Sequence, residues 1–185
     1  MKIAFVIFNE MTAIDLVGVY DPLTRLKTMG FISDISWDIC AFKPTVRDSA
    51  GLGLVPDKVG GSLAGYDIVV IPGGYGTRRL INDAAFLAWL ATAADCPLKV
   101  SVCTGSLLWG AAGFLEGLPA TTHRRAYETL QPFCAEVRSE RIVDAGKVIT
   151  AGGVTSGIDL GLYLCAKLAG PAARDSIARQ MEYQC

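Results

Sequence analysis

The stretch from residue 98 to residue 113 constrains the fold of this chain more than any other. It begins with the short apolar segment Leu98–Val102, whose β-branched residues are typical of a buried strand. The chain then turns at Cys103, and apolar residues recur at helical spacing from 107 to 112. This pattern places Cys103 at the carboxyl end of a strand and the amino end of a helix, where ligands bind in open α/β sheets.

The position of Cys103 predicts a nucleophile. The free N–H groups and the dipole of the following helix favour thiolate over thiol at such a junction. The expected geometry matches the nucleophile elbow of serine hydrolases, with sulfur in place of oxygen. The alternative is that Cys103 is a small buried apolar residue without a chemical role.

Strands and helices alternate over most of the chain. We expect strands at 2–8, 35–42, 67–72, 98–102 and 117–123, helices at 15–29, 84–94, 124–130, 154–169 and 172–183, and hairpins at 43–59 and 141–151. This order predicts an α/β three-layer sandwich, with a mostly parallel, flavodoxin-like sheet between helices on both faces and the hairpins at its edge. At 185 residues, we expect a single domain over 1–185. Pro22 predicts a kink or a late start in the first helix.

Composition excludes several classes of function. The net charge is −1 with the signs interspersed, and no basic stripe predicts a nucleic-acid partner or a membrane surface. No apolar run approaches the ~18 residues that cross a bilayer, and the apolar start reads as a strand, so we expect a cytoplasmic protein. Six cysteines without a CxxC pair and a single histidine predict neither a zinc site nor a disulfide framework.

Three loops should meet at one edge of the sheet. They carry Asp15, the pair Gly73 and Gly74, and Cys103 with Thr104. The glycine pair is either a plain turn or one half of an oxyanion hole, whose other half is the Thr104 N–H group. It matches neither GxxxxGK[ST] nor GxGxxG, so it is not predicted to bind phosphate in those ways.

Two further polar residues have open alternatives. Asp15 is either the N-cap of the first helix, which the pattern alone favours, or an acid that hydrogen-bonds the Cys103 sulfur and moves its proton. His123 is the one imidazole of the chain, so any Cys–His mechanism must use it. Otherwise His123 is a polar residue that closes a short strand.

Four spaced motifs carry a resemblance to a known family over essentially the whole chain. They are Ile71–Gly74, Val102–Ser106, Ala120–His123 and Gly152–Asp159. Together they resemble the ThiJ/PfpI superfamily, which has a class I glutamine-amidotransferase-like fold. Within it the chain is most similar to isocyanide hydratases and to the ligand domains of AraC-type regulators. Many members carry glutamate where this chain has Asp15, whereas the hydratases carry aspartate.

The resemblance implies an enzyme that adds water to an isocyanide to give an N-substituted formamide. It implies that Cys103 attacks the isocyanide carbon, that Asp15 supplies a proton and then activates water, and that Thr104 holds the intermediate with the Gly74 N–H group opposite. It implies a small-molecule substrate, no metal or organic cofactor, and a homodimer.

The chain departs from its relatives at two places. Arg124 stands where both groups of relatives usually have tryptophan, which changes the expected substrate pocket. The sequence stops at Cys185, where the regulators continue into a helix-turn-helix domain, so we expect no direct DNA binding. The alternatives are a glyoxalase-like, amidase or peptidase activity with His123 as base, a stress- or redox-sensing protein that oxidises at Cys103, and a freestanding ligand-binding domain.

Overall fold

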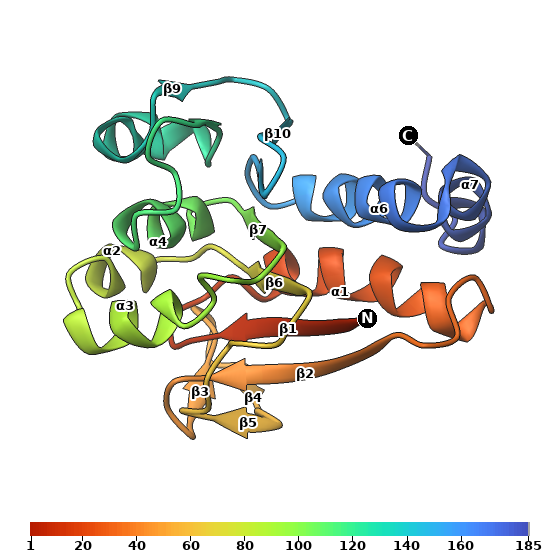
Figure 1. Ribbon diagram of the computed structural model, residues 1–185, viewed down its shortest axis with the longest axis horizontal. Helices are drawn as coiled ribbons and strands as arrows, with labels where there is room; N and C mark the ends of the chain where they lie inside the picture. The colour runs from red at the N-terminus through yellow and green to blue at the C-terminus, as the bar shows by residue number, and fades with distance from the viewer. Residues whose placement is uncertain (185) are drawn as a thin grey trace.

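A seven-stranded sheet forms the centre of the computed structural model, which describes residues 1–184. Its strands are β1 (Lys2–Ile7), β2 (Ser36–Ala41), β5 (Lys58–Val59), β6 (Ile68–Ile71), β7 (Leu98–Val102), β10 (Ile142–Asp144) and β11 (Val148–Ala151). They lie in the order β10-β11-β7-β6-β1-β2-β5 (Figure 1). All neighbouring pairs are parallel except β10 and β11, which form the expected antiparallel hairpin. The predicted mostly parallel α/β sheet is confirmed.

Two small strand pairs lie outside this sheet. The pair β3 (Val46–Arg47) and β4 (Gly53–Leu54) is antiparallel and forms the hairpin expected around residues 48–51. The pair β8 (Pro119–Ala120) and β9 (Glu136–Val137) is parallel. Neither β5 nor β9 was predicted, because a two-residue strand is too short to show an alternating pattern.

The helices form two groups, which Figure 1 shows on different sides of the sheet. One group consists of α1 (Ala13–Thr28), α6 (Ser156–Ala169) and α7 (Pro171–Gln180), which pack against one another. The other consists of α2 (Thr77–Leu80), α3 (Ala84–Ala91), α4 (Gly105–Ala111) and α5 (Tyr127–Leu130), with short 3₁₀ turns at Arg124–Ala126 and Gln131–Phe133. The predicted layering is therefore confirmed, and the short α2 is an element that periodicity did not reveal.

The central strands are covered on both faces. Every residue of β6 and β7 is buried, as are five of the six residues of β1. Even Lys99 in β7 is buried, and its ammonium group donates to the carbonyl oxygens of Ala94 and Cys96 at 3.0 and 2.9 Å. This explains why these strands are continuous apolar runs rather than alternating ones.

Close contact between α1 and α6 fixes the position of the first loop. A Cβ atom on Gly18 would lie 3.1 Å from the backbone of Gly157, and one on Gly161 would lie 2.8 Å from the Cγ atom of Pro22. The two helices therefore touch through glycine backbone. Of the two effects expected of Pro22, a kink or a late start of the helix, the late start was wrong: α1 begins at Ala13 and continues through Pro22.

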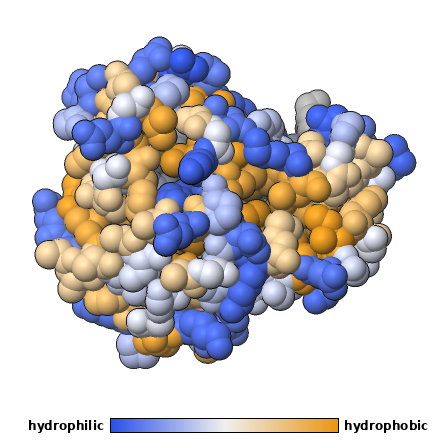
Figure 2. Space-filling model, in the orientation of Figure 1, coloured by the Kyte–Doolittle hydropathy of each residue, from blue (hydrophilic) through white to orange (hydrophobic). Residues whose placement is uncertain are grey.

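Figure 2 shows a largely hydrophilic surface over the segment around β9 and more apolar residues over α1 and α6. Ile14 and Val17 of α1 are 44 % and 51 % exposed. Within residues 1–184, no helix has both the length and the apolar character to cross a membrane. Cys185, one of the six cysteines, lies outside the described residues.

Candidate active site

Cys103 lies at the junction between β7 and α4, as predicted. Its φ of 55° is in the left-handed region, which a cysteine rarely adopts. Its N–H group lies 3.0 and 2.9 Å from the carbonyl oxygens of Ala151 and Gly152, which hold the strained turn. Such strain persists only where the surrounding structure enforces it, and it is common at functional sites. The junction therefore has the backbone geometry expected of a nucleophile elbow.

Asp15 lies within the first turn of α1 and is fully buried. Thr12 occupies the N-cap position, so the interpretation of Asp15 as a helix cap was wrong. The Asp15 Oδ2 atom accepts a hydrogen bond of 3.0 Å from the Gly73 N–H group. The other oxygen, Oδ1, is buried and has no partner of normal hydrogen-bond geometry among the described residues. That oxygen is free to accept a proton.

Burial controls the protonation of this pair. It raises the pKa of the Asp15 carboxyl group from 3.8 to about 6, while the Gly73 N–H group, the Cys103 thiol and the Val154 N–H group oppose the increase. Burial and the Asp15 charge raise the pKa of the Cys103 thiol to about 12, against the Thr104 and Val154 N–H groups. Both shifts oppose a state in which the carboxyl group and the thiol are ionised together, so the pair keeps at least one proton at neutral pH.

The expected thiolate at Cys103 is opposed by the burial of the sulfur, which raises the pKa of the thiol. The helix that follows Cys103 is only seven residues long, and its N–H groups lower the pKa of the thiol less than burial raises it. Part of the increase comes from the Asp15 charge, which disappears when Asp15 takes the proton. Ionisation of the sulfur is thus coupled to protonation of the carboxylate.

Val154 is a site residue that the sequence did not reveal. Its N–H group lowers the pKa of both Asp15 and Cys103, so this donor faces the pair. The geometry requires a φ of 50°, which is rare for a β-branched residue. Only the preceding Gly152 and Gly153 hinted at unusual backbone here, and the expected helix start at Val154 was two residues too early.

The glycine pair lies at the site but does not provide the expected oxyanion hole. The Gly73 N–H group donates to Asp15, and the Gly74 N–H group donates to the Thr104 Oγ1 atom at 3.0 Å. The Thr104 hydroxyl group in turn donates to the Gly74 carbonyl oxygen at 3.1 Å. The N–H groups of both glycines and the Thr104 hydroxyl proton are therefore already engaged in hydrogen bonds within the protein. The remaining donors at the sulfur are the backbone N–H groups of Thr104 and Val154.

Gly73 has to be a glycine because the pair closes around it. A Cβ atom there would lie 2.6 Å from the Thr104 nitrogen, 2.7 Å from the Cys103 Cβ atom and 2.8 Å from the Asp15 Oδ2 atom. These distances are shorter than van der Waals contact. They also show that residues from three separate loops meet at one point, as their places at the strand ends predicted.

A cavity of about 230 Å³ opens above the thiol. It is lined by Thr12, Gly74, Tyr75, Arg78, Cys103, Thr104, His123, Arg125 and Val154. Cys103 is only 7 % exposed, but it contributes to this lining, so a small molecule in the cavity can contact the sulfur. The cavity therefore joins Cys103 to two other predicted site residues, Thr104 and His123.

His123 lies in the cavity wall with its Nδ1 atom already engaged. That atom accepts a hydrogen bond of 3.2 Å from the Arg125 N–H group. Burial and the neighbouring arginines lower the pKa of the ring, so it is neutral at pH 7. In the neutral ring the proton then sits on Nε2, which makes this nitrogen a donor rather than a base.

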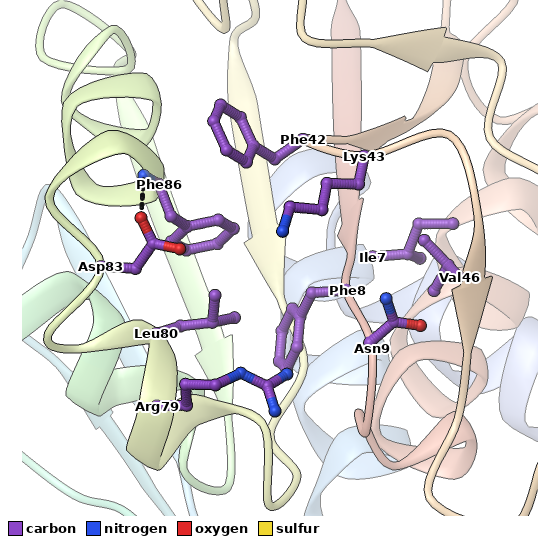
Figure 3. A pocket seen from close by; sticks show the side chains of 10 residues that line it. All are labelled: Ile7, Phe8, Asn9, Phe42, Lys43, Val46, Arg79, Leu80, Asp83 and Phe86. Atoms are coloured by element: carbon purple, nitrogen blue, oxygen red, sulfur yellow. Dashed lines mark hydrogen bonds between the residues drawn. The ribbon is translucent and has the colours of Figure 1, made fainter.

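A second, smaller cavity of about 60 Å³ lies beside the ends of β1 and β2 (Figure 3). Phe8, Phe42 and Phe86 line it, and its carboxylate, Asp83, caps α3 by accepting from the N–H groups of Ala85 and Phe86. It is too small for an organic substrate and is lined by no cysteine, serine or threonine. In the part of the chain that the structure describes, no three His, Cys, Asp or Glu side chains form a metal-binding group.

Comparisons with known proteins agree with this arrangement. The sequence pattern of the DJ-1/PfpI family matches residues 1–167. The chain is 34 % identical over 184 residues to an isonitrile hydratase of Pseudomonas putida, covering 99 % of this chain and 78 % of that protein. It is 25 % identical to the HTH-type transcriptional regulator GbdR of Pseudomonas aeruginosa, of which it spans about half the length (51 %).

A solved structure is similar over the whole chain. The crystal structure of a ThiJ/PfpI family protein from Pseudomonas syringae has a TM-score of 0.90 and 33 % identity, covering 100 % of this chain and 75 % of that one. The sheet order, the strained cysteine at the elbow and the family match lead to one conclusion. The chain belongs to the DJ-1/PfpI family.

Proposed function

We propose that this protein is a cysteine-dependent hydratase that converts an isocyanide and water into an N-substituted formamide. The observation that carries the proposal is the buried Asp15 carboxyl group, held by Gly73, beside the Cys103 thiol at the base of a cavity. The similarity to an isonitrile hydratase, over nearly the whole chain, supports the choice of substrate.

The first half of the reaction adds the thiol across the isocyanide carbon. Asp15 takes the proton of the Cys103 thiol on its free carboxyl oxygen, and the resulting thiolate attacks the carbon of R–N≡C. Asp15 then delivers that proton to the same carbon. The product is a thioimidate, R–N=CH–S, attached to Cys103, and the carboxylate is restored.

The second half adds water and releases the formamide. Asp15 accepts one proton from water as the water oxygen attacks the thioimidate carbon, and the second proton of that water passes to the nitrogen. The C–S bond then breaks to leave R–NH–CHO. The sulfur leaves with a negative charge that the Thr104 and Val154 N–H groups stabilise until Asp15 returns its proton.

The direct test is ultraviolet-monitored formation of formamide from an aryl isocyanide. Cys103→Ala and Asp15→Asn should reduce kcat/KM to the background rate, because each removes one partner of the pair. Cys134→Ala is the matched control, because Cys134 is a partly exposed cysteine outside the cavity, and it should retain wild-type activity. A wild-type protein no faster than Cys103→Ala would exclude the proposed reaction.

A second candidate uses the same nucleophile in a glyoxalase-like, amidase or peptidase reaction with His123 as base. The observation in its favour is that His123 lines the same cavity as Cys103. Its Nδ1 hydrogen bond to Arg125 disfavours the role, since the available nitrogen is a donor. We therefore expect His123→Ala to retain isocyanide turnover. Loss of activity toward a glyoxal or an amide in His123→Ala, with isocyanides not consumed by the wild type, would favour the second candidate.

A third candidate is a redox-sensing role for Cys103. The observation in its favour is that the thiol lines an open cavity. The raised pKa of the thiol opposes rapid oxidation, because the thiolate is the reactive form. Intact mass after mild peroxide distinguishes the two: a gain of two oxygens at Cys103, without turnover of any isocyanide, would support the sensor.

A further inference from the structure

The wall of the Cys103 cavity carries positive charge without a matching negative charge. Arg78 of α2 and Arg125 of the 3₁₀ turn at 124–126 both line it. No aspartate or glutamate appears among its lining residues within 1–184. The two arginines come from segments far apart in the sequence, and both line the same cavity.

Arg79, next to Arg78 in the sequence, serves as a comparison because its charge is paired with a carboxylate. Arg79 forms an ion pair of 3.0 Å with Glu10, whereas neither Arg78 nor Arg125 is within ion-pair distance of a carboxylate among the described residues. Arg78 instead packs against the ring of Tyr75, 5.3 Å from its centroid. This contact holds the guanidinium group in place and leaves its N–H donors free.

The arginine charges act on His123, which also lines the cavity. After burial, the largest causes of the lowered pKa of His123 are the charges of Arg125, Arg124 and Arg78. His123 lines the cavity, so the positive potential extends to its interior. The opposing charge, Asp15, is fully buried beneath the thiol and is not part of the lining. An anionic group is therefore favoured beside the two arginines and disfavoured directly over the sulfur, next to Asp15.

We propose that the cavity selects substrates bearing a carboxylate, which Arg78 and Arg125 bind while Cys103 reacts with the other end of the molecule. Guanidinium groups bind carboxylates through two parallel hydrogen bonds, and the volume of about 230 Å³ suits a small molecule of this kind. This inference rests on the proposed function for the reacting group. The preference for an anion is a property of the cavity wall and can be tested separately.

The first experiment compares 4-isocyanobenzoate with its neutral methyl ester. The wild type should have a kcat/KM about tenfold higher for the carboxylate, the effect of one or two charged hydrogen bonds. In Arg78→Gln and Arg125→Gln this ratio should fall toward one, and in the double variant it should be lost. Arg79→Gln, whose charge is already paired with Glu10, should keep the wild-type ratio. An equal kcat/KM for the two substrates in the wild type would overturn the inference.

The second experiment needs no turnover. 4-(Iodoacetamido)benzoate is anionic and its methyl ester is neutral, and both alkylate a reactive thiol with the benzoate group held away from the sulfur. The ratio of their rates at Cys103, followed by peptide mass spectrometry and divided by the same ratio for glutathione, should exceed one and fall by about tenfold in the double variant. A ratio above one without any isocyanide turnover would keep the anion site and reject the hydratase. A ratio of one or less, unchanged in the double variant, would reject the anion site.

Discussion

At the scale of single residues, the proposed chemistry depends on a carboxyl group placed where ionisation is costly. Asp15 is fully buried, one of its oxygens is held by Gly73, and its pKa is raised to about 6. A carboxyl group with no role beyond capping α1 would be more stable exposed to water. The cost is consistent with a proton acceptor for Cys103, since a general base works best with a pKa near the operating pH.

This cost predicts how the stability of the protein depends on pH. Because the folded-state pKa of Asp15 is raised, its contribution to stability is fully present below pH 3.8 and is lost as the pH rises through about 6. Asparagine does not ionise, so the Asp15→Asn variant does not lose this stability as the pH rises. The unfolding free energy of the variant relative to wild type should therefore increase by about 3 kcal/mol between pH 3.5 and pH 7.5. Urea unfolding at the two pH values measures it, and an unchanged difference would contradict the burial argument.

Gly73 is the second residue whose identity the site requires. Gly73→Ala places a Cβ atom within 2.8 Å of Asp15, Cys103 and Thr104. We expect a loss of about 1–3 kcal/mol in unfolding free energy and of about 100-fold in kcat/KM. Gly61→Ala is the control, because a Cβ atom there has no atom within 4 Å. Wild-type activity in Gly73→Ala would show that these three residues lie less close to Gly73 than described.

At the scale of elements, the contact between α1 and α6 sets the position of Asp15. Gly161→Ala adds a Cβ atom 2.8 Å from Pro22 and 3.0 Å from the Gly18 carbonyl oxygen. Alanine favours a helix over glycine by about 1 kcal/mol, but separating the two helices costs about 1–3 kcal/mol. We therefore expect lower thermal stability together with lower kcat/KM. Calorimetry showing a more stable variant would mean that the helices are not held by this contact.

The elements also show what the sequence could and could not predict. The strands β1, β6 and β7 were predictable because burial on both faces makes them continuous apolar runs. Short α2, which carries Arg78, has no periodic pattern to detect. The left-handed Val154 was not predictable either, because its conformation is imposed by contacts with distant residues and not by a local preference.

In the candidate site, too, some features were predictable from the sequence and others were not. Cys103, Asp15 and the two glycines were singled out correctly as residues that meet, since the carboxyl ends of parallel strands share one edge of the sheet. Their hydrogen-bond partners were not predictable. Which N–H group donates to Asp15 and which to Thr104 depends on distances between loops that sequence spacing does not contain.

At the scale of the whole molecule, the resemblance to the family predicts a homodimer. The exposed apolar residues Ile14 and Val17 on α1 provide a surface on which a second copy could pack. We expect sedimentation velocity at micromolar concentration to give twice the chain mass of 19.7 kDa. A single species at the chain mass over a tenfold range of concentration would contradict this prediction.

The proposed proton transfer from Cys103 to Asp15 is tested most directly by the pH dependence of kcat/KM for isocyanide hydration by the wild type. If the Cys103 thiol ionises only by giving its proton to Asp15, the rate requires an ionised carboxylate. It should rise with a midpoint near pH 6 and then remain constant to about pH 9, because the pKa of the thiol itself is about 12. A rise with its midpoint near the ordinary cysteine pKa of about 8.5 would show that the thiol ionises independently and would contradict the account.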